Sequence, residues 1–386
     1  MTPIRPFQSE TDPAQLADLR DRLARSRFAP ALSGTDWTLG TPPGYLAELL
    51  DYWRTEFDWL AAERRINTLP QFVAEIGGTT LHFVHAKGIG PRPFPLVFAH
   101  GWPGSFLEVR KILGPLTDPA AHGGDPADAF DVIAPSLPGF GFSPHPGTPG
   151  MNPMAIAELL HRLMTEVLGY PRYGAQGGDW GGQIVTALAR AHGDSVAGIH
   201  LNLIGLTPVL DEHSAPLTEA ELAFQAQLAR FLAEEGGYAL IQATRPATIG
   251  AALADSPAGL AAWIVEKFRA WSDCGGDVES VFDKDELLTA ITLYWLTNTA
   301  ATSARLYHEA ARSAGMFSRD DPGYVATPTG YACFPKDNVT PPEEWLRRAY
   351  HLTRYTRFEH GGHFVALERP EDLVTEIREF FRSVRP

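Results

Sequence analysis

The segment 177–182 has the sequence Gly-Gly-Asp-Trp-Gly-Gly and lies between a short strand pattern and an amphipathic helix pattern. Small residues on both sides of Asp179 allow the sharp strand-to-helix turn called a nucleophile elbow, which lifts the central side chain into a cleft. Ile184, Val185 and Leu188 then give the following helix one apolar face. The segment therefore predicts a strand, a tight turn and a helix around the Asp179 carboxylate.

Asp179 stands where esterases and lipases carry their nucleophilic serine. A serine that attacked an sp3 carbon would leave an ether, which water does not readily cleave. A carboxylate is ionised near neutral pH and leaves an ester that an activated water can hydrolyse. The elbow therefore predicts displacement at carbon through a covalent ester, followed by hydrolysis of that ester.

Strand and helix patterns alternate from about residue 90 to residue 205, and two further strand patterns precede a final helix. Such alternation is typical of the α/β class and predicts a mainly parallel sheet covered by helices. Together with the elbow, it predicts the α/β-hydrolase fold. The expected strands are Pro95–Ala99, Phe130–Ala134, Ile199–Ile204, Tyr331–Phe334 and Tyr355–Phe358, and the expected closing helix is Pro370–Arg382.

A stretch without strand patterns separates the two parts of this core. Residues 208–325 show only helical patterns, which predicts a helical cap inserted between the core segments 91–207 and 326–386. Residues 1–90 are predicted to wrap around the catalytic domain, because their aromatic surface needs a partner to pack on. The expected cap helices are Glu219–Glu234, Gly259–Trp271 and Glu286–Arg312, and the wrapping region is expected to hold a helix after Asp12, a helix over Pro43–Arg65 and a hairpin around Gly77 and Gly78.

Charge balance and cysteine usage exclude several function classes. The 386 residues carry a formal net charge of −14 without a basic run, so nucleic acid and anionic membranes are poor partners. Cys274 and Cys333 give no disulfide framework, although one bridge between them stays open. The N-terminus lacks the apolar core of a signal peptide, and no apolar run approaches about 18 residues. We therefore expect a cytoplasmic protein without a membrane partner, whose oligomeric state, a homodimer included, stays open.

A nucleophilic carboxylate needs a base to activate water, an acid to orient that base, and N–H donors for the developing oxyanion. In α/β-hydrolases the acid and then the histidine follow the nucleophile along the chain. His363 lies on a Gly-rich loop before the closing helix, where the base is expected. Asp337 follows the preceding strand, where the acid is expected, with Glu343 and Glu344 as nearby rivals.

Two tryptophans are the expected sources of the oxyanion-hole donors. Trp102, in the segment 100–103 (His-Gly-Trp-Pro), follows an early strand and is placed to offer its backbone N–H. Trp180 comes directly after the nucleophile and offers the second donor. Each motif is weak alone, because Gly-x-Asp-x-Gly is most often an ordinary turn and His-Gly after a strand is common. Their order at the ends of successive strands is what predicts a hydrolase.

No metal and no cofactor are expected. His360 and His363 are two histidines without the cluster of cysteines or carboxylates that metal sites use. The two-step ester chemistry runs on side chains and water, and needs no bound cofactor.

Longer segments in all three regions match one known family. They are Leu19-Arg20 to Arg27-Phe28, Tyr52-Trp53, Phe57–Trp59 and Leu81–His85 in the N-terminal region, His100–Ser105, Gly177–Gly181 and Gly361–Phe364 in the core, and Gly237–Gln242 and Asp255–Ala261 in the cap. Through them the chain resembles, over essentially its full length, the microsomal-type epoxide hydrolase family of the α/β-hydrolase fold. The resemblance implies an enzyme that converts an epoxide and water to a vicinal diol.

The resemblance also implies two acids in the cap. Tyr238 and Tyr307 match the paired tyrosines that polarise the epoxide oxygen, with Tyr294 as a competing choice close to Tyr307. A phenol, with an ordinary pKa near 10, stays protonated and can donate to the ring oxygen. The resemblance further suggests a cis peptide bond at Trp102–Pro103. Membrane-bound relatives carry an N-terminal anchor, whereas this sequence starts directly with the wrapping region, so a soluble protein is implied. Some relatives have Glu at the position of Asp337, and either acid can orient a histidine.

Two other functions stay open for this sequence. A haloalkane dehalogenase also uses an aspartate nucleophile, often beside a tryptophan, but it needs halide donors and no paired phenols. A non-catalytic ligand-binding homologue would usually have lost a residue of the triad. Diol formation, halide release, or binding with neither distinguishes the three. The cap is rich in Trp, Phe and Leu, which indicates a bulky apolar or aromatic epoxide as the substrate, although the same residues could simply form the core of the cap.

Overall fold

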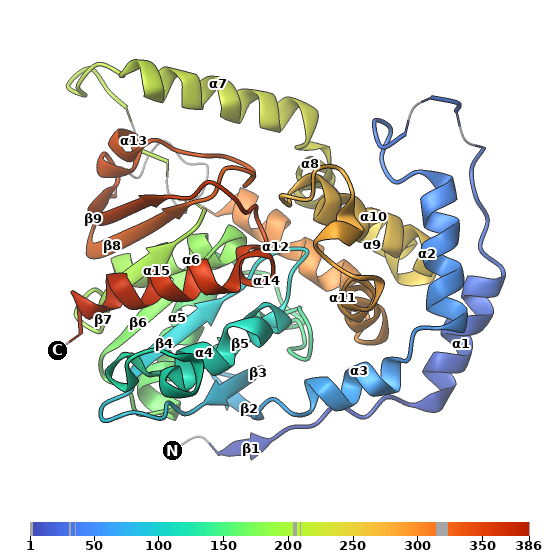
Figure 1. Cartoon of the computed structure of the whole chain (residues 1–386), viewed down its shortest axis with the longest axis horizontal. Helices are drawn as coiled ribbons and strands as arrows, with labels where there is room; N and C mark the ends of the chain where they lie inside the picture. The colour runs from blue at the N-terminus through green and yellow to red at the C-terminus, as the bar shows by residue number, and fades with distance from the viewer. Residues whose placement is uncertain are drawn as a thin grey trace.

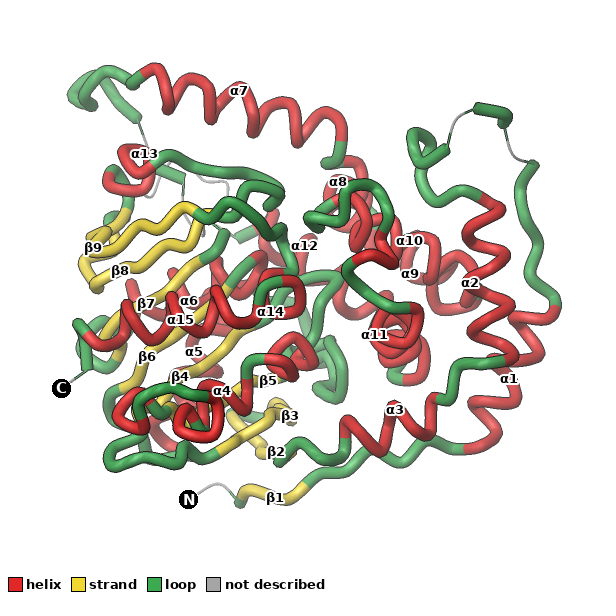
Figure 2. Tube along the Cα trace, viewed as in Figure 1, coloured by secondary structure: helices red, strands yellow, loops and turns green. Residues whose placement is uncertain are grey.

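A computed structural model gives the fold of the chain and describes residues 3–30, 32–34, 36–203, 207–208, 210–313 and 323–385. A nine-stranded sheet forms the centre, with helices on both faces and a group of cap helices beside it (Figures 1 and 2). The strands lie in the order β1-β2-β3-β5-β4-β6-β7-β8-β9. The strands are β1 (Ile4–Pro6), β2 (Gln71–Ile76), β3 (Thr79–Ala86), β4 (Phe94–Ala99), β5 (Phe130–Pro135), β6 (Tyr173–Gly177), β7 (Val196–Leu201), β8 (Val325–Cys333) and β9 (Tyr350–Arg357).

The six strands from β4 to β9 are parallel, which confirms the predicted α/β-hydrolase fold with a mainly parallel sheet. The N-terminal region does more than wrap around this core, because β1, β2 and β3 extend the same sheet with antiparallel pairing. The hairpin predicted around Gly77 and Gly78 is β2–β3, and both glycines have the positive φ that its turn requires.

Several expected strand bounds were wrong by a few residues. The strand expected over Ile199–Ile204 begins earlier, at Val196, and ends at Leu201, while Ile204 lies outside the described residues. The strand β8 begins at Val325, the last residue of the predicted cap stretch. The sequence pattern did not indicate this start, because the first residues of β8 alternate between buried and exposed and form no continuous apolar run. The strand β9 likewise begins before the expected Tyr355.

Helices cover both faces of the sheet. The last helix, α15, lies on one face and contacts β7 and β8, while α6 lies on the other and contacts β6, β7 and β8 (Figure 1). The bounds of α15 are those predicted from the sequence. The covering elements are η1 (Phe106–Lys111), α4 (Leu113–Thr117), η2 (Pro119–His122), η3 (Pro126–Asp128), α5 (Pro153–Arg162), η4 (Leu163–Val167), α6 (Asp179–Ala191), α13 (Glu343–Arg347), α14 (Val365–Glu368) and α15 (Pro370–Arg382).

The wrapping region contains three helices where two were expected: α1 (Pro13–Ala24), α2 (Pro43–Thr55) and α3 (Trp59–Ile66). The helix expected over Pro43–Arg65 is interrupted because Asp58 caps a new helix, accepting a hydrogen bond from the Ala61 N–H at 3.1 Å. Asp12 caps α1 as predicted. Arg22 of α1 forms an ion pair with Asp255 of the cap at 2.8 Å, and α1 and α2 pack against α10 (Figure 1).

The cap consists of six α-helices in its described residues: α7 (Glu219–Glu234), α8 (Gly237–Thr244), α9 (Pro246–Asp255), α10 (Pro257–Ala270), α11 (Lys284–Leu296) and α12 (Ala300–Arg312), with a short turn η5 (Val278–Ser280). The single helix expected over Glu286–Arg312 is two helices, since Asn298 adopts a left-handed φ of 53° between them. Helix α7 has the predicted bounds and carries a full capping box from Thr218 and Glu221.

No single helix in the described ranges is long and apolar enough to span a membrane. Helices α9 and α10 together reach such a length and composition, but they are bent by 114° at the break between them. Cys274 and Cys333 are both buried and are not joined by a disulfide.

Gly181 marks the tightest contact between the elbow helix and the sheet. A Cβ atom at this position would lie 1.9 Å from the carbonyl oxygen of Ala99 in β4. Because backbone cannot yield as a flexible side chain does, we expect Gly181→Ala to lower the free energy of unfolding by about 2 kcal/mol or more. Urea denaturation followed by circular dichroism measures this change.

Gly44→Ala is the matched control, because a Cβ atom there meets nothing within 4 Å. This substitution in α2 is expected to leave the free energy of unfolding unchanged or to raise it by up to about 1 kcal/mol. Equal effects of the two substitutions would contradict the proposed contact.

Candidate active site

Four loops at the carboxyl ends of neighbouring parallel strands bring the predicted site residues together. Trp102 follows β4, Asp179 follows β6, Asp337 follows β8 and His363 follows β9. Residues Ala99 and Gly177, the last of β4 and β6, are partners in the sheet register, so the two loops leave the sheet at the same level. This edge of an open α/β sheet is where ligands bind in such folds.

Asp179 occupies the strained turn that the elbow motif predicts. Its φ is +49°, a left-handed value that few non-glycine residues adopt. Its Oδ1 accepts a hydrogen bond from the backbone N–H of Trp102 at 2.9 Å. This approach requires glycine at position 101, since a Cβ atom there would lie 2.2 Å from Asp179 Oδ1. The Trp102–Pro103 peptide bond is cis, as the resemblance suggested.

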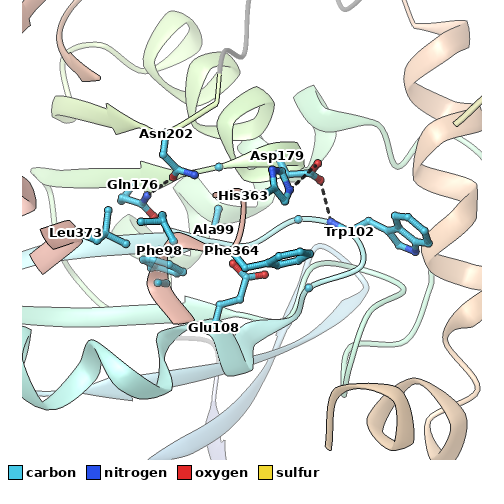
Figure 3. A pocket seen from close by; sticks show the side chains of 15 residues that line it. Phe98, Ala99, Trp102, Glu108, Gln176, Asp179, Asn202, His363, Phe364 and Leu373 are labelled. Atoms are coloured by element: carbon cyan, nitrogen blue, oxygen red, sulfur yellow. Dashed lines mark hydrogen bonds and ion pairs between the residues drawn. The ribbon is translucent and has the colours of Figure 1, made fainter. Parts of the chain in front are cut away.

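His363 lies between the two predicted carboxylates. Figure 3 shows it beside Asp179. Its Nδ1 is 2.7 Å from Asp337 Oδ1, and its Nε2 is 3.4 Å from Asp179 Oδ2. Both His363 and Asp337 are 7% exposed, so their charges interact in a poorly solvated environment. Glu343, a rival for the acid, instead forms a surface ion pair with Arg347 at 2.6 Å.

The charges around His363 determine its protonation. Burial lowers the pKa of the imidazole, but the charge of Asp337 and the hydrogen bonds to Asp179 and Asp337 outweigh it. The net result raises the pKa of His363 well above its ordinary value of 6.5. The resting site therefore favours an imidazolium between two carboxylates.

Tyr238 lies in the first turn of α8 and Tyr307 lies in α12, and their ring centroids are 5.8 Å apart. The Trp102 ring stacks on Tyr238 at 5.1 Å, and the Trp180 ring meets the Tyr307 ring edge-on at 4.6 Å. The cap thus places both predicted tyrosines over the loops that carry the nucleophile. Trp180 itself lies in the first turn of α6, directly after Asp179.

Both tyrosine hydroxyls are held in the protonated state. Burial raises the pKa of Tyr307 well above 10, and Tyr238 and the Asp179 carboxylate act in the same direction. Burial and then Asp179 likewise raise the pKa of Tyr238. The Tyr307 hydroxyl is buried and has no hydrogen-bond partner that meets ordinary geometry among the described residues. The rival Tyr294 instead donates to the carbonyl oxygen of Gly104 at 2.8 Å.

The cap also anchors the loop of His363, through residues that the sequence analysis missed. The backbone N–H of His363 donates to the carbonyl oxygen of Trp271 at 2.8 Å, and the two rings are 5.1 Å apart. Asp273 accepts a hydrogen bond from the Gly361 N–H at 3.0 Å and gives its own N–H to Glu368 at 2.8 Å. No motif marks these residues, because the contacts join segments about 90 positions apart.

Three further polar residues line a pocket beside Asp179 and His363: Glu108, Gln176 and Asn202 (Figure 3). Glu108 had a signal in the sequence, since it is an acid among the apolar residues that follow the segment 100–105. Gln176 is the last residue but one of β6 and Asn202 directly follows β7, and both strands are buried throughout. In the ranges that the structure describes, no group of three or more His, Cys, Asp or Glu residues could hold a metal ion.

Comparisons with known proteins show the family to which this chain belongs. Residues 4–109 match the family described as epoxide hydrolase N terminus, and residues 95–370 match the alpha/beta hydrolase fold. Epoxide hydrolase 1 of Oryctolagus cuniculus is 38% identical, with 98% of this chain and 88% of the relative covered. A protein of Stigmatella aurantiaca (strain DW4/3-1) is 43% identical over 99% of this chain and 86% of its own length. The chain belongs to the microsomal epoxide hydrolase family.

Solved structures of epoxide hydrolases have the same fold. The Aspergillus niger epoxide hydrolase superposes with a TM-score of 0.87 at 32% identity, covering 99% of this chain and 97% of that one. The juvenile hormone epoxide hydrolase of the silkworm Bombyx mori gives 0.84 at 32% identity, covering 100% and 95%. By this full-length homology the protein is an epoxide hydrolase. The homology favours this function over a haloalkane dehalogenase and over a non-catalytic ligand-binding homologue.

The position of Asp337 predicts how His363 titrates in this epoxide hydrolase. Because the charge of Asp337 raises the pKa of His363, Asp337→Asn is expected to lower that pKa, while the wild type titrates above 6.5. Nitrogen-15 NMR of the imidazole across a pH series measures both values. An unchanged His363 pKa in the variant would contradict this coupling.

His82 serves as the internal control. Burial lowers its pKa to about 3, and its ring bonds to Ser136 Oγ at 2.8 Å, far from this triad in the chain. It is expected to remain neutral through the same pH series in both proteins.

Proposed function

We propose that this epoxide hydrolase opens its substrate through a covalent ester on Asp179. The hydrogen bond from Trp102 N–H to Asp179 Oδ1 supports this most strongly, because it engages one carboxylate oxygen and leaves Oδ2, on the side of His363, as the attacking atom. Oδ2 attacks an epoxide carbon from the side opposite the ring oxygen. The attacked carbon is therefore inverted in the diol product.

Tyr238 and Tyr307 act as the acids that assist ring opening. Their raised pKa values keep both phenols protonated at neutral pH, so both can donate to the epoxide oxygen. As the strained C–O bond breaks, that oxygen becomes an alkoxide, which is basic enough to take a proton from a phenol. The positions of both tyrosines over Asp179 support attack and protonation from opposite sides of the substrate.

His363 changes its role between the two steps because the charge beside it changes. In the free enzyme the carboxylates of Asp179 and Asp337 favour the imidazolium. Ester formation removes the charge of Asp179, which lowers the pKa of His363 and favours the neutral imidazole. The neutral ring then takes a proton from water, and Asp337 orients it and stabilises the imidazolium that forms.

The backbone N–H groups of Trp102 and Trp180 hold the oxyanion when water attacks the ester. Trp102 already donates to Asp179 Oδ1, the atom that carries the negative charge in the tetrahedral intermediate. The N–H of Trp180 is the second donor, since the residue directly after the nucleophile supplies it in elbows of this kind.

The substrate is an apolar or aromatic epoxide. Where the cap meets the loop of the nucleophile, aromatic rings pack on one another and form apolar walls, and they belong to Trp102, Trp180, Tyr238, Trp271 and Tyr307. Such walls favour apolar surface and aromatic stacking, and the paired hydroxyls supply the polar contacts for one oxygen.

A single turnover of styrene oxide in ¹⁸O-labelled water tests the ester. In the first turnover of the wild type the new diol oxygen comes from Asp179, so the diol is expected to be unlabelled. His363→Gln is expected to accumulate an alkyl-enzyme adduct heavier than the protein by the mass of the epoxide, and Asp179→Asn to form none. Label in the first diol would instead mean direct attack by water.

Removal of the hydroxyls tests the acids. Tyr238→Phe and Tyr307→Phe are each expected to slow ester formation about 100-fold, because each removes one proton donor to the leaving oxygen. Stopped-flow tryptophan fluorescence measures this step. Tyr52→Phe is the control and is expected to keep the wild-type rate, because the Tyr52 hydroxyl, in the wrapping region, instead donates to Asp285 of α11 at 3.0 Å. Equal rates in all four proteins would remove the tyrosines from the mechanism.

A further inference from the structure

A largely enclosed cavity of about 20 Å³ lies against the catalytic pair Asp179 and His363. This volume is enough for one water molecule and close to enough for two. Its polar lining comes from separate parts of the fold: Glu108 in η1, Gln176 in β6 and Asn202 after β7 (Figure 3). Phe98, Phe364 and Leu373 close it with apolar surface.

Gln176 offers this cavity an unused acceptor. The residue is 1% exposed, and its Nε2 donates to Asn202 Oδ1 at 2.9 Å. Its Oε1 is buried and has no hydrogen-bond partner within the described part of the chain. A buried carbonyl without a hydrogen-bond partner destabilises the fold. A small hydrogen-bond donor in the cavity would therefore stabilise Gln176 by pairing with its Oε1.

Glu108 offers a group that both donates and accepts. Its carboxyl packs against Gly104, where a Cβ atom would lie 1.6 Å from Oε1. Burial raises the pKa of Glu108 to about 8, with His363 lowering it and Asp179 raising it further. Near neutral pH the carboxyl is thus mainly protonated, with one O–H donor and one C=O acceptor.

We propose that this cavity binds the water that hydrolyses the Asp179 ester, and that Glu108 and Gln176 are its positioning residues. The inference rests on the proposed function, because it concerns only the second step. Water fits where the lining is polar, the volume is that of one molecule, and His363 borders the same space. An enclosed site also delivers this water without opening the aromatic walls around the substrate.

The hydrolysis step balances with these groups. The water oxygen bonds to Cγ of Asp179 while one water proton moves to Nε2 of the neutral His363. The tetrahedral intermediate then breaks the bond between Cγ and the diol oxygen, and that oxygen takes the proton from His363. Asp179 is left as a carboxylic acid, whose proton returns to His363. The proton that Tyr238 or Tyr307 gave to the epoxide oxygen is replaced from the imidazolium of the resting enzyme.

Rates of ester formation and ester hydrolysis, measured separately in single turnovers of styrene oxide, test the site. Glu108→Leu and Gln176→Met remove the polar groups at nearly constant volume and are expected to slow hydrolysis about tenfold or more, because the water loses its orientation. Ester formation is expected to stay within about twofold of the wild type. Glu108→Gln is the matched control: its neutral amide also donates and accepts, so hydrolysis is expected to recover to within about threefold.

Three results would overturn the water site. Hydrolysis at the wild-type rate in Glu108→Leu or Gln176→Met is one, and an equal slowing of both steps, the mark of a purely structural role, is another. Loss of hydrolysis in Glu108→Gln equal to that in Glu108→Leu is the third. If Glu108→Leu does not fold, Gln176→Met and Glu108→Gln decide the outcome. A wild type that forms no ester overturns the proposed function as well, whereas an ester with unaltered hydrolysis overturns the water site alone.

Discussion

The site depends on one hydrogen bond, from the Trp102 backbone N–H to Asp179 Oδ1. Two backbone features allow this hydrogen bond to form, the left-handed turn at Asp179 and the glycine at position 101. The register of the sheet is a third such feature, since Ala99 of β4 pairs with Gly177 of β6 and both loops therefore start side by side. A strained residue persists only where its surroundings over-determine it. Here the neighbouring strand, the elbow helix and the oxyanion donor all hold the same carboxylate.

Burial gives this carboxylate its influence over its neighbours. Burial raises the pKa of both cap tyrosines and the charge of Asp337 raises that of His363, and the Asp179 carboxylate adds to each effect, so its negative charge favours the protonated form of all three side chains. Alkylation of Asp179 would remove that charge from all of them at once. The cap contributes to this coupling by excluding water and by fixing the loop of His363 through the Trp271 carbonyl.

Much of the fold follows from local signals in the sequence. The bounds of α7 and α15 were predicted without error, because Thr218 caps the first and Pro370 begins the second. The same reasoning failed where apolar spacing continued across a break. The expected helices Pro43–Arg65 and Glu286–Arg312 are each interrupted, by a capping aspartate in one case and a left-handed asparagine in the other. The spacing of apolar residues indicates which face of a helix is buried, but it does not reveal a single residue at which the chain turns and the helix ends.

The sequence by itself predicted Asp179, His363 and Asp337 as nucleophile, base and acid, since each must follow a parallel strand in a given order and the motifs carry that order. It also determined the family, through segments spread over the whole chain. Only the tertiary structure decided among the rivals: Asp337 over Glu343, and Tyr307 over Tyr294, whose hydroxyl is taken up by Gly104. It alone placed Gln176 and Glu108 around one cavity. The reason is physical, because a buried polar group is defined by partners distant in the chain, and no local pattern records them.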